Sequence, residues 1–299
     1  MNYITKKLAE FASRAMMYEV SCYPSPGLVS PVSNGAHKDM DYHTFLKSIA
    51  VLNKYMYDFA IVGSREDNLE EIFTKIRKIG IRAEEDMFEV TEGVNTHKGM
   101  IFLMGITVSI LAYAIKYKFT FDKIQDLIKK MCKGITNELK IAESKPKEER
   151  THGENLYVKY KFLGIRGEVE KGIPLAFEIG LSAYENAKDL TVNDRLVQTL
   201  ITIMSKCEDS TILHRNNLEC LELVQNISKS LLERGGVYNE EVIEEIYKLN
   251  DIFISKNISP GGSADILAIT VLLSLAKNEF FSAFTKEDDK KKSQICYWN

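Results

Sequence analysis

The feature that most constrains the fold of this 299-residue chain is a helical hydrophobic period that runs through nearly all of it. Leu8, Phe11, Ala12, Ala15 and Met16 follow the 3.6-residue spacing of one buried helical stripe. No stretch alternates apolar and polar residues long enough to predict a β-sheet, and only six prolines interrupt the chain. We therefore predict an all-α fold. Further helices are expected at about 44–62, 67–80, 97–117, 120–142, 169–187, 191–206, 217–234, 239–256 and 263–283.

Few segments look like domain boundaries. Residues 143–151 form a charged connector, residues 23–36 are rich in Pro, Gly, Ser and Asn, and residues 286–293 are a charge run. None has the composition of an interdomain linker. We expect one domain over 1–299, a multi-helix bundle with its active-site cleft at helix ends, and a flexible tail at 286–299.

Charge and cysteine content narrow the class of function. The chain has 39 Lys and Arg against 42 Asp and Glu, which argues against a nucleic-acid partner. A small anionic ligand needs only a local cluster of cations. The five cysteines are scattered and form no CxxC pair, so neither a zinc site nor a disulfide framework is indicated and a reduced, cytoplasmic setting is expected.

Two segments bear on membrane association. The N-terminal 20 residues carry acids and an amphipathic pattern instead of the apolar core of a signal peptide. Residues 100–115 are apolar but number only 16, fewer than the ~20 that span a bilayer. A central helix buried on all sides is expected there, and no membrane partner.

The breaks between the expected helices are unusually rich in Gly, His, Asp, Glu, Asn and Arg. All five histidines lie in or beside these breaks, whereas ordinary helical turns use simpler turn residues. Polar groups at several helix ends could converge on one cleft. The histidines are His37, His43, His97, His152 and His214.

The segment NGAHKDMDYHTF (34–45) offers two interpretations. If a helix begins near Asp39 or Asp41, these carboxylates at its entrance can share a Mg²⁺ ion through oxygen ligands and water. Alternatively, Asp39 and Asp41 only cap the helix and favour its dipole. Taken alone, the segment favours the capping interpretation.

The segment GVNTHKGMIF (93–102) places Asn95, Thr96, His97 and Lys98 just before the most apolar helix. Backbone N–H groups at such a helix start suit a phosphate, and Lys98 adds a positive charge. The alternative is a Thr96 cap beside a surface lysine.

Three further loops hold charged residues. THGE and GIRGEVEKG contribute Glu154, Arg166 and Glu168; Arg166 could fork onto a phosphate or pair with Glu168. DSTILHR places Asp209 and Arg215 on either side of His214, a relation that is usually structural.

ISPGGSADILA (258–268) leads into an apolar helix. Gly261 and Gly262 permit a tight anion-binding turn, and Asp265 in the first turn could reach a metal ion. Ser263 as an N-cap explains part of the pattern. No GxxxxGK[ST] or GxGxxG motif occurs, so neither a P-loop nor a Rossmann site is indicated.

Together these segments resemble the triphosphoribosyl-dephospho-coenzyme A synthase family. The similar stretches are EVSCYPSPGLVSPVSNGAHKDMDYHTF, GVNTHKGMIF, THGE, GIRGEVEKG, DSTILHR and ISPGGSADILA, in the family order from about residue 19 to 270. Each is modestly specific alone, and six in order are a strong signal.

The resemblance implies an all-α fold and one reaction. The 2′-hydroxyl of 3′-dephospho-coenzyme A attacks the ribose C1′ of ATP, and adenine leaves. The product is the precursor of the prosthetic group on the acyl carrier protein of citrate lyase or malonate decarboxylase. The chain is thereby expected to be an enzyme that acts on small nucleotides, with an indirect link to such a carrier protein.

The resemblance also implies site residues, which occupy the corresponding positions of the family motifs. Three places depart from the family pattern: Ser30, Thr211 and the pair Asn216 and Asn217. The matching residues are His37, Asp39, Asn95, His97, Lys98, His152, Glu154, Arg166, Glu168, Asp209, Arg215, Ser263 and Asp265.

Breaking an N-glycosidic bond needs an acid near the base, a base near the attacking hydroxyl and neutralised phosphates. Our hypothesis gives Mg²⁺ to Asp39, Asp41 and Asp265, with Asp209 as a further ligand. Glu154 or Glu168 is the base, with His37 and His97 as further catalytic candidates. The expected nucleotide- and phosphate-binding residues are Asn95, Lys98, His152, Arg166, Arg215, Gly261, Gly262 and Ser263.

Two rival functions stay open. An enzyme like the ADP-ribosyl-glycohydrolases is also helical and Mg²⁺-dependent, but it releases the ribosyl group to water. A non-catalytic helical nucleotide-binding protein would use the polar loops only as caps, and it would show no Mg²⁺-dependent stabilisation by ATP.

Overall fold

The structure is a computed structural model that describes residues 2–282, so the predicted tail at 286–299 lies outside the described residues. The described part is helical, and its one β-type pairing is an isolated bridge between Ser30 and Ser33, which confirms the all-α prediction. The helices are α1 (Asn2–Ser21), α2 (Tyr42–Arg65), α3 (Leu69–Val90), α4 (Lys98–Lys116), α5 (Ile124–Met131), α6 (Asn137–Ile141), α7 (His152–Tyr160), α8 (Gly164–Glu170), α9 (Leu181–Asn186), α10 (Val192–Met204), α11 (Ser210–Arg215), α12 (Leu218–Glu233), α13 (Glu240–Ser255) and α14 (Gly261–Ala276).

Shorter turns join several of these helices. The 3₁₀ turns are η1 (Phe121–Lys123), η2 (Ala142–Ser144), η3 (Lys147–Glu149) and η5 (Gly236–Tyr238); the π-helical turns are η4 (Leu175–Gly180) and η6 (Lys277–Phe281).

Two helices, α4 and α14, form the centre of the fold. Of 19 residues in α4, 13 are buried, and of 16 in α14, 12 are buried. Helix α4 is long and apolar enough to cross a membrane, but 72% of its most apolar window is buried inside the protein, as in a core helix. This burial agrees with the expectation for residues 100–115.

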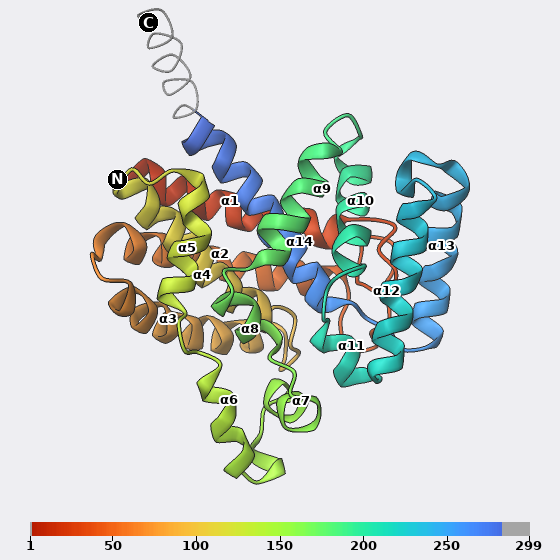
Figure 1. The fold of residues 1–299 in the computed structure, drawn as a ribbon, viewed down its shortest axis with the longest axis horizontal. Coiled ribbons are helices and arrows are strands. Elements are labelled where there is room, and N and C mark those ends of the chain that lie inside the picture. Colours follow the sequence, from red (N-terminus) through yellow and green to blue (C-terminus); the bar gives the residue numbers. More distant parts are fainter. Residues whose placement is uncertain (1, 283–299) are drawn as a thin grey trace, which may run out of the picture.

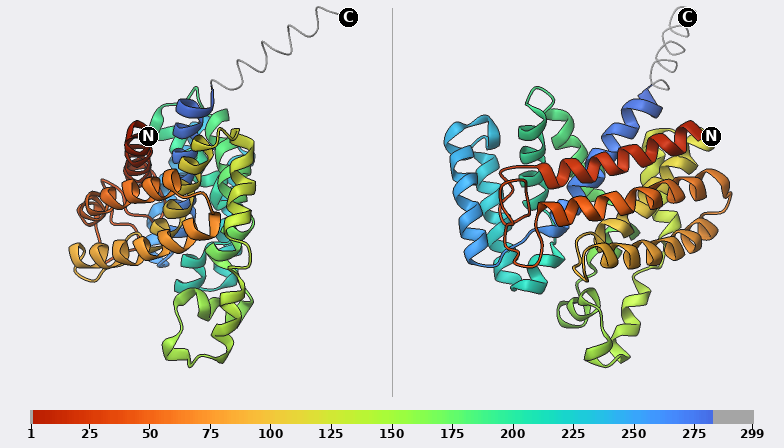
Figure 2. Two further views of the ribbon diagram at one scale, coloured as in Figure 1. Left: turned by 90° about the vertical axis from the view of Figure 1, so that its left-hand side faces the viewer. Right: turned by 180° about the vertical axis from the view of Figure 1, so that it is seen from behind.

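The remaining helices pack around this centre. Helices α1 and α2 lie side by side behind α14, and α12 and α13 stand together at one end of the molecule (Figures 1 and 2). Helices α6 and α7 project at the bottom in Figure 1. The α2–α4 crossing is close enough to require glycine, since a Cβ on Gly63 would lie 1.9 Å from the Ser109 carbonyl oxygen.

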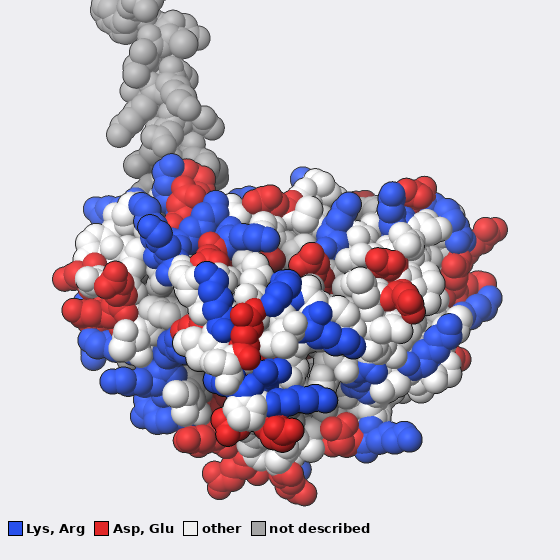
Figure 3. All heavy atoms as spheres, turned by 60° about the horizontal axis from the view of Figure 1, so that its bottom comes forward, with Lys and Arg blue, Asp and Glu red and all other residues white. Residues whose placement is uncertain are grey.

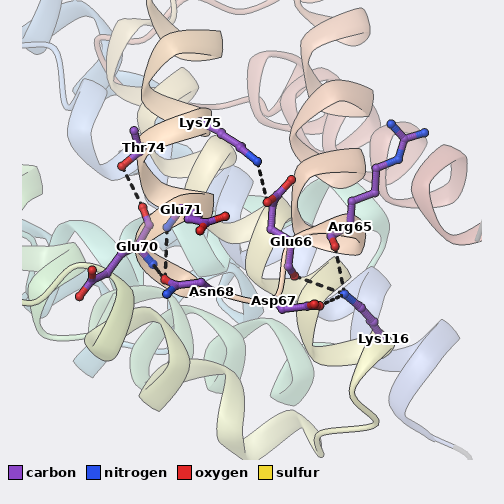
Figure 4. Close-up of polar contacts among 9 residues, drawn as sticks. All are labelled: Arg65, Glu66, Asp67, Asn68, Glu70, Glu71, Thr74, Lys75 and Lys116. Atoms are coloured by element: carbon purple, nitrogen blue, oxygen red, sulfur yellow. Dashed lines mark hydrogen bonds and ion pairs between the residues drawn. The ribbon is translucent and has the colours of Figure 1, made fainter.

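The turn between α2 and α3 is tied to the far end of α4 (Figure 4). Lys116 Nζ donates to the carbonyl oxygens of Arg65, at 3.2 Å, and Glu66, at 3.4 Å, and it also pairs with Asp67. Asn68 caps α3 by accepting from the Glu70 N–H at 2.7 Å. These contacts hold the α2–α3 hairpin against α4 at the end opposite to its N-terminus.

Several expected boundaries are wrong. The helix expected at 120–142 is broken at Gly134, whose φ of +83° no helix accommodates, and the one expected at 169–187 is broken at Gly172, also at φ +83°. Helix α14 begins at Gly261 after Pro260, so Ser263 lies inside it and is not its N-cap. The alternative of a Thr96 cap is also wrong, because His97 holds the N-cap position of α4.

Candidate active site

A cavity of about 160 Å³ lies where the N-termini of α4 and α14 meet. Six of the predicted site residues line it: His37, Asn95, His97, Lys98, Gly261 and Asp265. Glu19 of α1 and Thr211 of α11 also line it. A more open hollow of about 340 Å³ beside α9 and α10 contains none of the predicted residues.

Asp265 and Glu19 are the acidic residues of this cavity. Within the described part of the chain, neither carboxylate accepts a hydrogen bond or forms an ion pair. Burial raises the pKa of Glu19 to about 8. Burial, with the nearby Glu19 and Asp209 carboxylates, also raises the pKa of Asp265 well above its usual range.

Glu19 lines the cavity but received no role in the sequence interpretation, although it begins the family-like stretch EVSCYPSPG. It continues the apolar stripe of α1, four residues after Ala15, and only 6% of it is exposed. An acid in the middle of a buried helical stripe was the available signal, because an acid with a buried side chain is rare unless it is paired.

Gly99 brings the two central helices together. A Cβ on Gly99 would lie 2.4 Å from Asp265 Oδ2 and 3.7 Å from Ile165 Cδ1. Because glycine has no side chain, the Asp265 carboxylate can pack directly against the first turn of α4, next to α8.

His97 sits at the start of α4 with its ring 2% exposed. Thr96 Oγ1 donates to Ser48 Oγ at 2.9 Å, and Ser48 Oγ lies 2.7 Å from His97 Nδ1. Because Ser48 Oγ accepts from Thr96, its own O–H can donate a hydrogen bond to Nδ1, an arrangement in which the ring proton lies on Nε2. Nε2 has no hydrogen-bond partner within residues 2–282. Burial lowers the pKa of His97 to about 3, so the ring is neutral.

Lys98 and Asn95 complete the N-terminus of α4. Asn95 Oδ1 accepts from the Lys98 N–H at 3.1 Å, and the half-exposed Lys98 ammonium pairs with Glu84 at 2.8 Å. Lys98 is thus a positive charge at the cavity mouth. Its ion pair with Glu84 lies at the surface, where such pairs contribute little to stability.

Asp209 is a structural clamp between α11 and α14. Its Oδ1 accepts from the N–H groups of Thr211, at 2.9 Å, and Ile212, at 3.3 Å, and caps α11. Its Oδ2 accepts from Ser263, from the N–H at 2.7 Å and from Oγ at 3.0 Å. Burial raises the pKa of Asp209, and these hydrogen bonds oppose the rise.

The Gly261–Gly262 pair has a packing role beside this clamp. A Cβ on Gly261 would lie 3.0 Å from Thr211 Oγ1, and a Cβ on Gly262 would lie 3.1 Å from Asp209. The glycines let α11 approach the start of α14. Since the Ser263 N–H is bound to Asp209, this turn offers fewer free donors to a phosphate than the sequence suggested.

His37 and Arg215 join three distant segments. His37 Nε2 lies 2.9 Å from Ser259 Oγ, and Arg215 Nη1 lies 3.3 Å from the same ring. Arg215 also donates to the Ala36 carbonyl and to Asn257 Oδ1. Burial, with the Arg215 charge next, lowers the pKa of His37 to about 4.

The four predicted metal-binding aspartates do not form one cluster. Asp41 caps α2 in a capping box with Thr44, and the mostly exposed Asp39 lies 3.8 Å from His37 Nδ1. Among residues 2–282, no group of three or more His, Cys, Asp or Glu side chains could hold a metal ion. Of the four, Asp265 alone lines the cavity.

A second polar group adjoins the cavity through α11. The rings of His152 in α7 and His214 in α11 stack with their centroids 3.6 Å apart. Arg166 Nη1 lies near Gly153, and Arg166 Nε is 3.6 Å from Glu138. This group therefore lies on α7, α8 and α11, outside the residues that line the cavity.

The two predicted base candidates differ in their surroundings. Glu154 forms a capping box with Thr151 and an ion pair with Lys145 at 2.6 Å; although burial raises its pKa, these contacts outweigh burial and lower it. Glu168 accepts from the Leu175 N–H at 2.7 Å, and burial raises its pKa.

Glu168 belongs to the neighbourhood of Asp209 and Asp265. Burial raises the pKa of the Cys207 thiol, and the charges of all three carboxylates raise it further. Cys207 thus lies within electrostatic reach of the acids on α8, α11 and α14. The cysteines of the described part, Cys22, Cys132, Cys207 and Cys220, are free.

The positions that depart from the family pattern are structural in part. Ser30 is buried and bridges to Ser33, Thr211 contributes to the cavity wall, and Asn217 caps α12 by accepting from the Cys220 N–H at 2.9 Å. On the face shown in Figure 3, basic and acidic side chains are interspersed. This face therefore offers no extended single-sign surface to a polyanion.

The chain matches the CitG protein family, described as ATP:dephospho-CoA triphosphoribosyl transferase, over residues 5–282. It is 33% identical over 290 residues to 2-(5''-triphosphoribosyl)-3'-dephosphocoenzyme-A synthase of Haemophilus ducreyi, covering 90% of this chain and 88% of the relative. A Photobacterium profundum protein named as a probable synthase of the same compound is 36% identical, covering 90% of this chain and 87% of the relative. Protein CitXG of Leuconostoc mesenteroides is 37% identical over 88% of this chain and 57% of the relative. No solved structure matches the chain.

Proposed function

Since the chain belongs to the ATP:dephospho-CoA triphosphoribosyl transferase family, we propose that it transfers the 5-triphosphoribosyl group of ATP to the 2′-hydroxyl of 3′-dephospho-coenzyme A and releases adenine. The observation that carries this proposal is the cavity at the N-termini of α4 and α14, within a family match that spans almost the whole chain. The family match favours transfer over the hydrolase and the binding protein.

The reaction sets clear chemical demands. The C1′–N9 bond breaks with its electrons going to adenine, so positive charge develops on the ribose and the base requires a proton. The attacking 2′-hydroxyl loses a proton as the new C1′–O bond forms. Each well-placed proton transfer contributes typically about 10²–10⁴-fold to the rate.

Binding of the triphosphate is assigned to the start of α4. Lys98 supplies positive charge at the cavity mouth, and the helix terminus favours anions. The neutral His97 ring, with its proton on Nε2, is suited to donate to a phosphate oxygen. Asn95 fixes the first turn, while Arg166 and His152 would extend phosphate binding toward α7 and α8.

Glu168 is the better candidate for the base. Its raised pKa suits proton removal near neutral pH, whereas Glu154 is committed to Lys145 and Thr151. Arg215 and His37 hold the 36–41 loop against the α13–α14 connection, and we assign to them positioning of the cavity wall.

Mg²⁺ is proposed to enter with ATP. The cavity passes a test of fit, because the oxygens of Asp265 and Glu19 have no hydrogen-bond or ion-pair partner among residues 2–282. Asp265 would hold the ion, which would neutralise triphosphate charge. Asp209 supports the site from behind by placing the first turn of α14, whereas Asp41 is engaged in the cap of α2 and Asp39 faces His37.

The product would be the precursor of the prosthetic group on an acyl carrier protein of citrate lyase or malonate decarboxylase. The substrates are small, cytoplasmic nucleotides, and the proposal requires neither a nucleic acid nor a membrane.

The test is to incubate the purified protein with ATP, Mg²⁺ and 3′-dephospho-coenzyme A and to measure free adenine by chromatography. Adenine that appears only with the acceptor supports the transfer. Adenine released without acceptor would favour the hydrolase, and no adenine under any condition, with the protein shown to be folded, would contradict the proposal.

A further inference from the structure

We propose that Glu19 and Asp265 together hold one divalent cation of the Mg²⁺ type in the cavity, with Glu19, the first residue of the family-like stretch EVSCYPSPG, as a ligand on α1. The inference deepens the proposed function and rests on it for the role of the cation, but the binding of the cation can be measured without the reaction.

The first line of support is the unsatisfied state of both carboxylates. Glu19 is 6% exposed, and within the described residues neither it nor Asp265 has a hydrogen-bond donor or a cationic partner. Burying a carboxylate without a partner costs several kcal/mol, so buried acids in proteins are normally paired or bind metal. The contrast is Asp209 close by, which accepts four hydrogen bonds.

A second, independent observation points to a ligand in the same place. His97 also lines the cavity, is 2% exposed, and has no partner for Nε2. When the Ser48 hydroxyl donates to Nδ1, the ring proton lies on that nitrogen. Two carboxyl groups and one neutral imidazole, all unpaired within the described residues of one cavity, match a cation that would displace the carboxyl protons and whose bound water or phosphate oxygens the histidine can contact.

The composition of the cavity selects the type of cation. Zn²⁺ sites use three or four His, Cys or carboxylate ligands, and the described residues contain no such group. Mg²⁺ is held by one or two carboxylates and completes its octahedron with water and substrate phosphates. About 160 Å³ is ample for a hydrated ion, since one water needs only roughly 10–15 Å³.

The experiment uses Mn²⁺ as the probe, titrated into the full-length protein with and without ATP and without acceptor, and reads free Mn²⁺ by electron paramagnetic resonance. We expect one site that tightens with ATP. Because loss of a supporting residue alone costs about 10–100-fold in metal affinity, Glu19→Gln and Asp265→Asn should each lower Mn²⁺ affinity at least about tenfold. Mg²⁺ should displace the bound Mn²⁺.

Glu10→Gln is the matched control, because Glu10 lies on the same helix, is exposed and pairs with Lys7 at 2.8 Å. It should bind Mn²⁺ like the wild type. Thermal melts followed by circular dichroism show whether each variant is folded. Glu19→Asp, which keeps the carboxylate, should bind Mn²⁺ more tightly than Glu19→Gln if the carboxylate is a ligand.

The outcomes separate this inference from the proposed function. Unchanged Mn²⁺ affinity in folded Glu19→Gln overturns the inference, even if adenine release is normal in the wild type. Loss of affinity only in Asp39→Asn or Asp41→Asn moves the cation to the start of α2 and also overturns it. Glu19-dependent Mn²⁺ binding without any adenine release would support the cation site and contradict the transferase reaction.

Discussion

At the scale of single residues, two buried carboxylates in the same region have opposite surroundings. Asp209 is 1% exposed and accepts hydrogen bonds at both oxygens, from α11 and from α14. Glu19 is almost equally buried and accepts none. Since a buried acid is normally hydrogen-bonded, the contacts of Asp209 account for its burial, whereas those of Glu19 do not.

The clamp made by Asp209 leads to a stability prediction. Asp209→Ala removes the cap of α11 and leaves the N–H of Ser263 buried without a partner, so the free energy of unfolding should fall by about 2–4 kcal/mol. Urea denaturation followed by circular dichroism measures the change. Asn217→Ala, which removes an exposed cap of α12, should cost only about 1 kcal/mol. Equal losses in both variants would contradict the clamp.

At this scale the sequence indicated much of the cavity lining but not the contacts of each side chain. Asp265, His97 and Lys98 were predicted from their place at helix starts, and they line the cavity. Asp209 was assigned to metal because a sequence cannot show that both its oxygens are taken. Glu19 begins the family-like stretch EVSCYPSPG but was given no role, because the sequence does not show that it shares a cavity with Asp265 of α14, more than 240 residues away.

At the scale of elements, the apolar runs predicted the two central helices, and glycines determined where other elements stop. Gly134 and Gly172 both adopt left-handed backbone and divide segments that hydrophobic period alone predicts as continuous. The period is local, whereas the break depends on what packs nearby. A Cβ on Gly172, for example, would lie 2.7 Å from the Gln125 carbonyl oxygen.

Gly99 provides a prediction for the α4–α14 contact. Gly99→Ala puts a Cβ 2.4 Å from Asp265 Oδ2 and must displace that carboxylate, so kcat/KM for adenine release should fall on the order of 10²-fold. The fold should survive, because the displaced atom is the end of a side chain. Gly80→Ala in α3, whose Cβ would meet only Ile101 at 3.9 Å, should keep full activity and gain up to about 1 kcal/mol in stability.

Enzyme kinetics and thermal melts of both variants measure these effects. Normal kcat/KM in Gly99→Ala would show that the position of the Asp265 carboxylate is not critical.

At the scale of the whole molecule, the all-α class followed from the hydrophobic period, but the arrangement of the helices did not. Local pattern shows which face of a helix is buried and not which helix covers it. Long-range packing brings His37, Arg215 and Ser259 together. It also forms the cavity between α1, α4 and α14. The six family-like motifs were therefore identified without any knowledge of which of them lie side by side in the wall of the cavity.

The contact of His37 with Arg215 and Ser259 makes the stability of the whole fold depend on pH. The pKa of His37 is about 4 in the folded protein, against 6.5 for an ordinary histidine, because burial and the Arg215 charge disfavour its protonation. On acidification, the unfolded chain therefore protonates His37 near pH 6.5, whereas the folded protein protonates it only near pH 4. By linkage, the contribution of His37 to the free energy of unfolding is fully present above pH 6.5 and is lost as pH falls toward 4.

Compared with His37→Gln, which keeps a polar group facing Ser259 but does not titrate, the wild type should lose about 1–2 kcal/mol more stability between pH 7 and pH 5. Urea unfolding of both proteins at several pH values checks this, and parallel pH profiles would mean that His37 protonates in the folded protein as readily as in the unfolded chain.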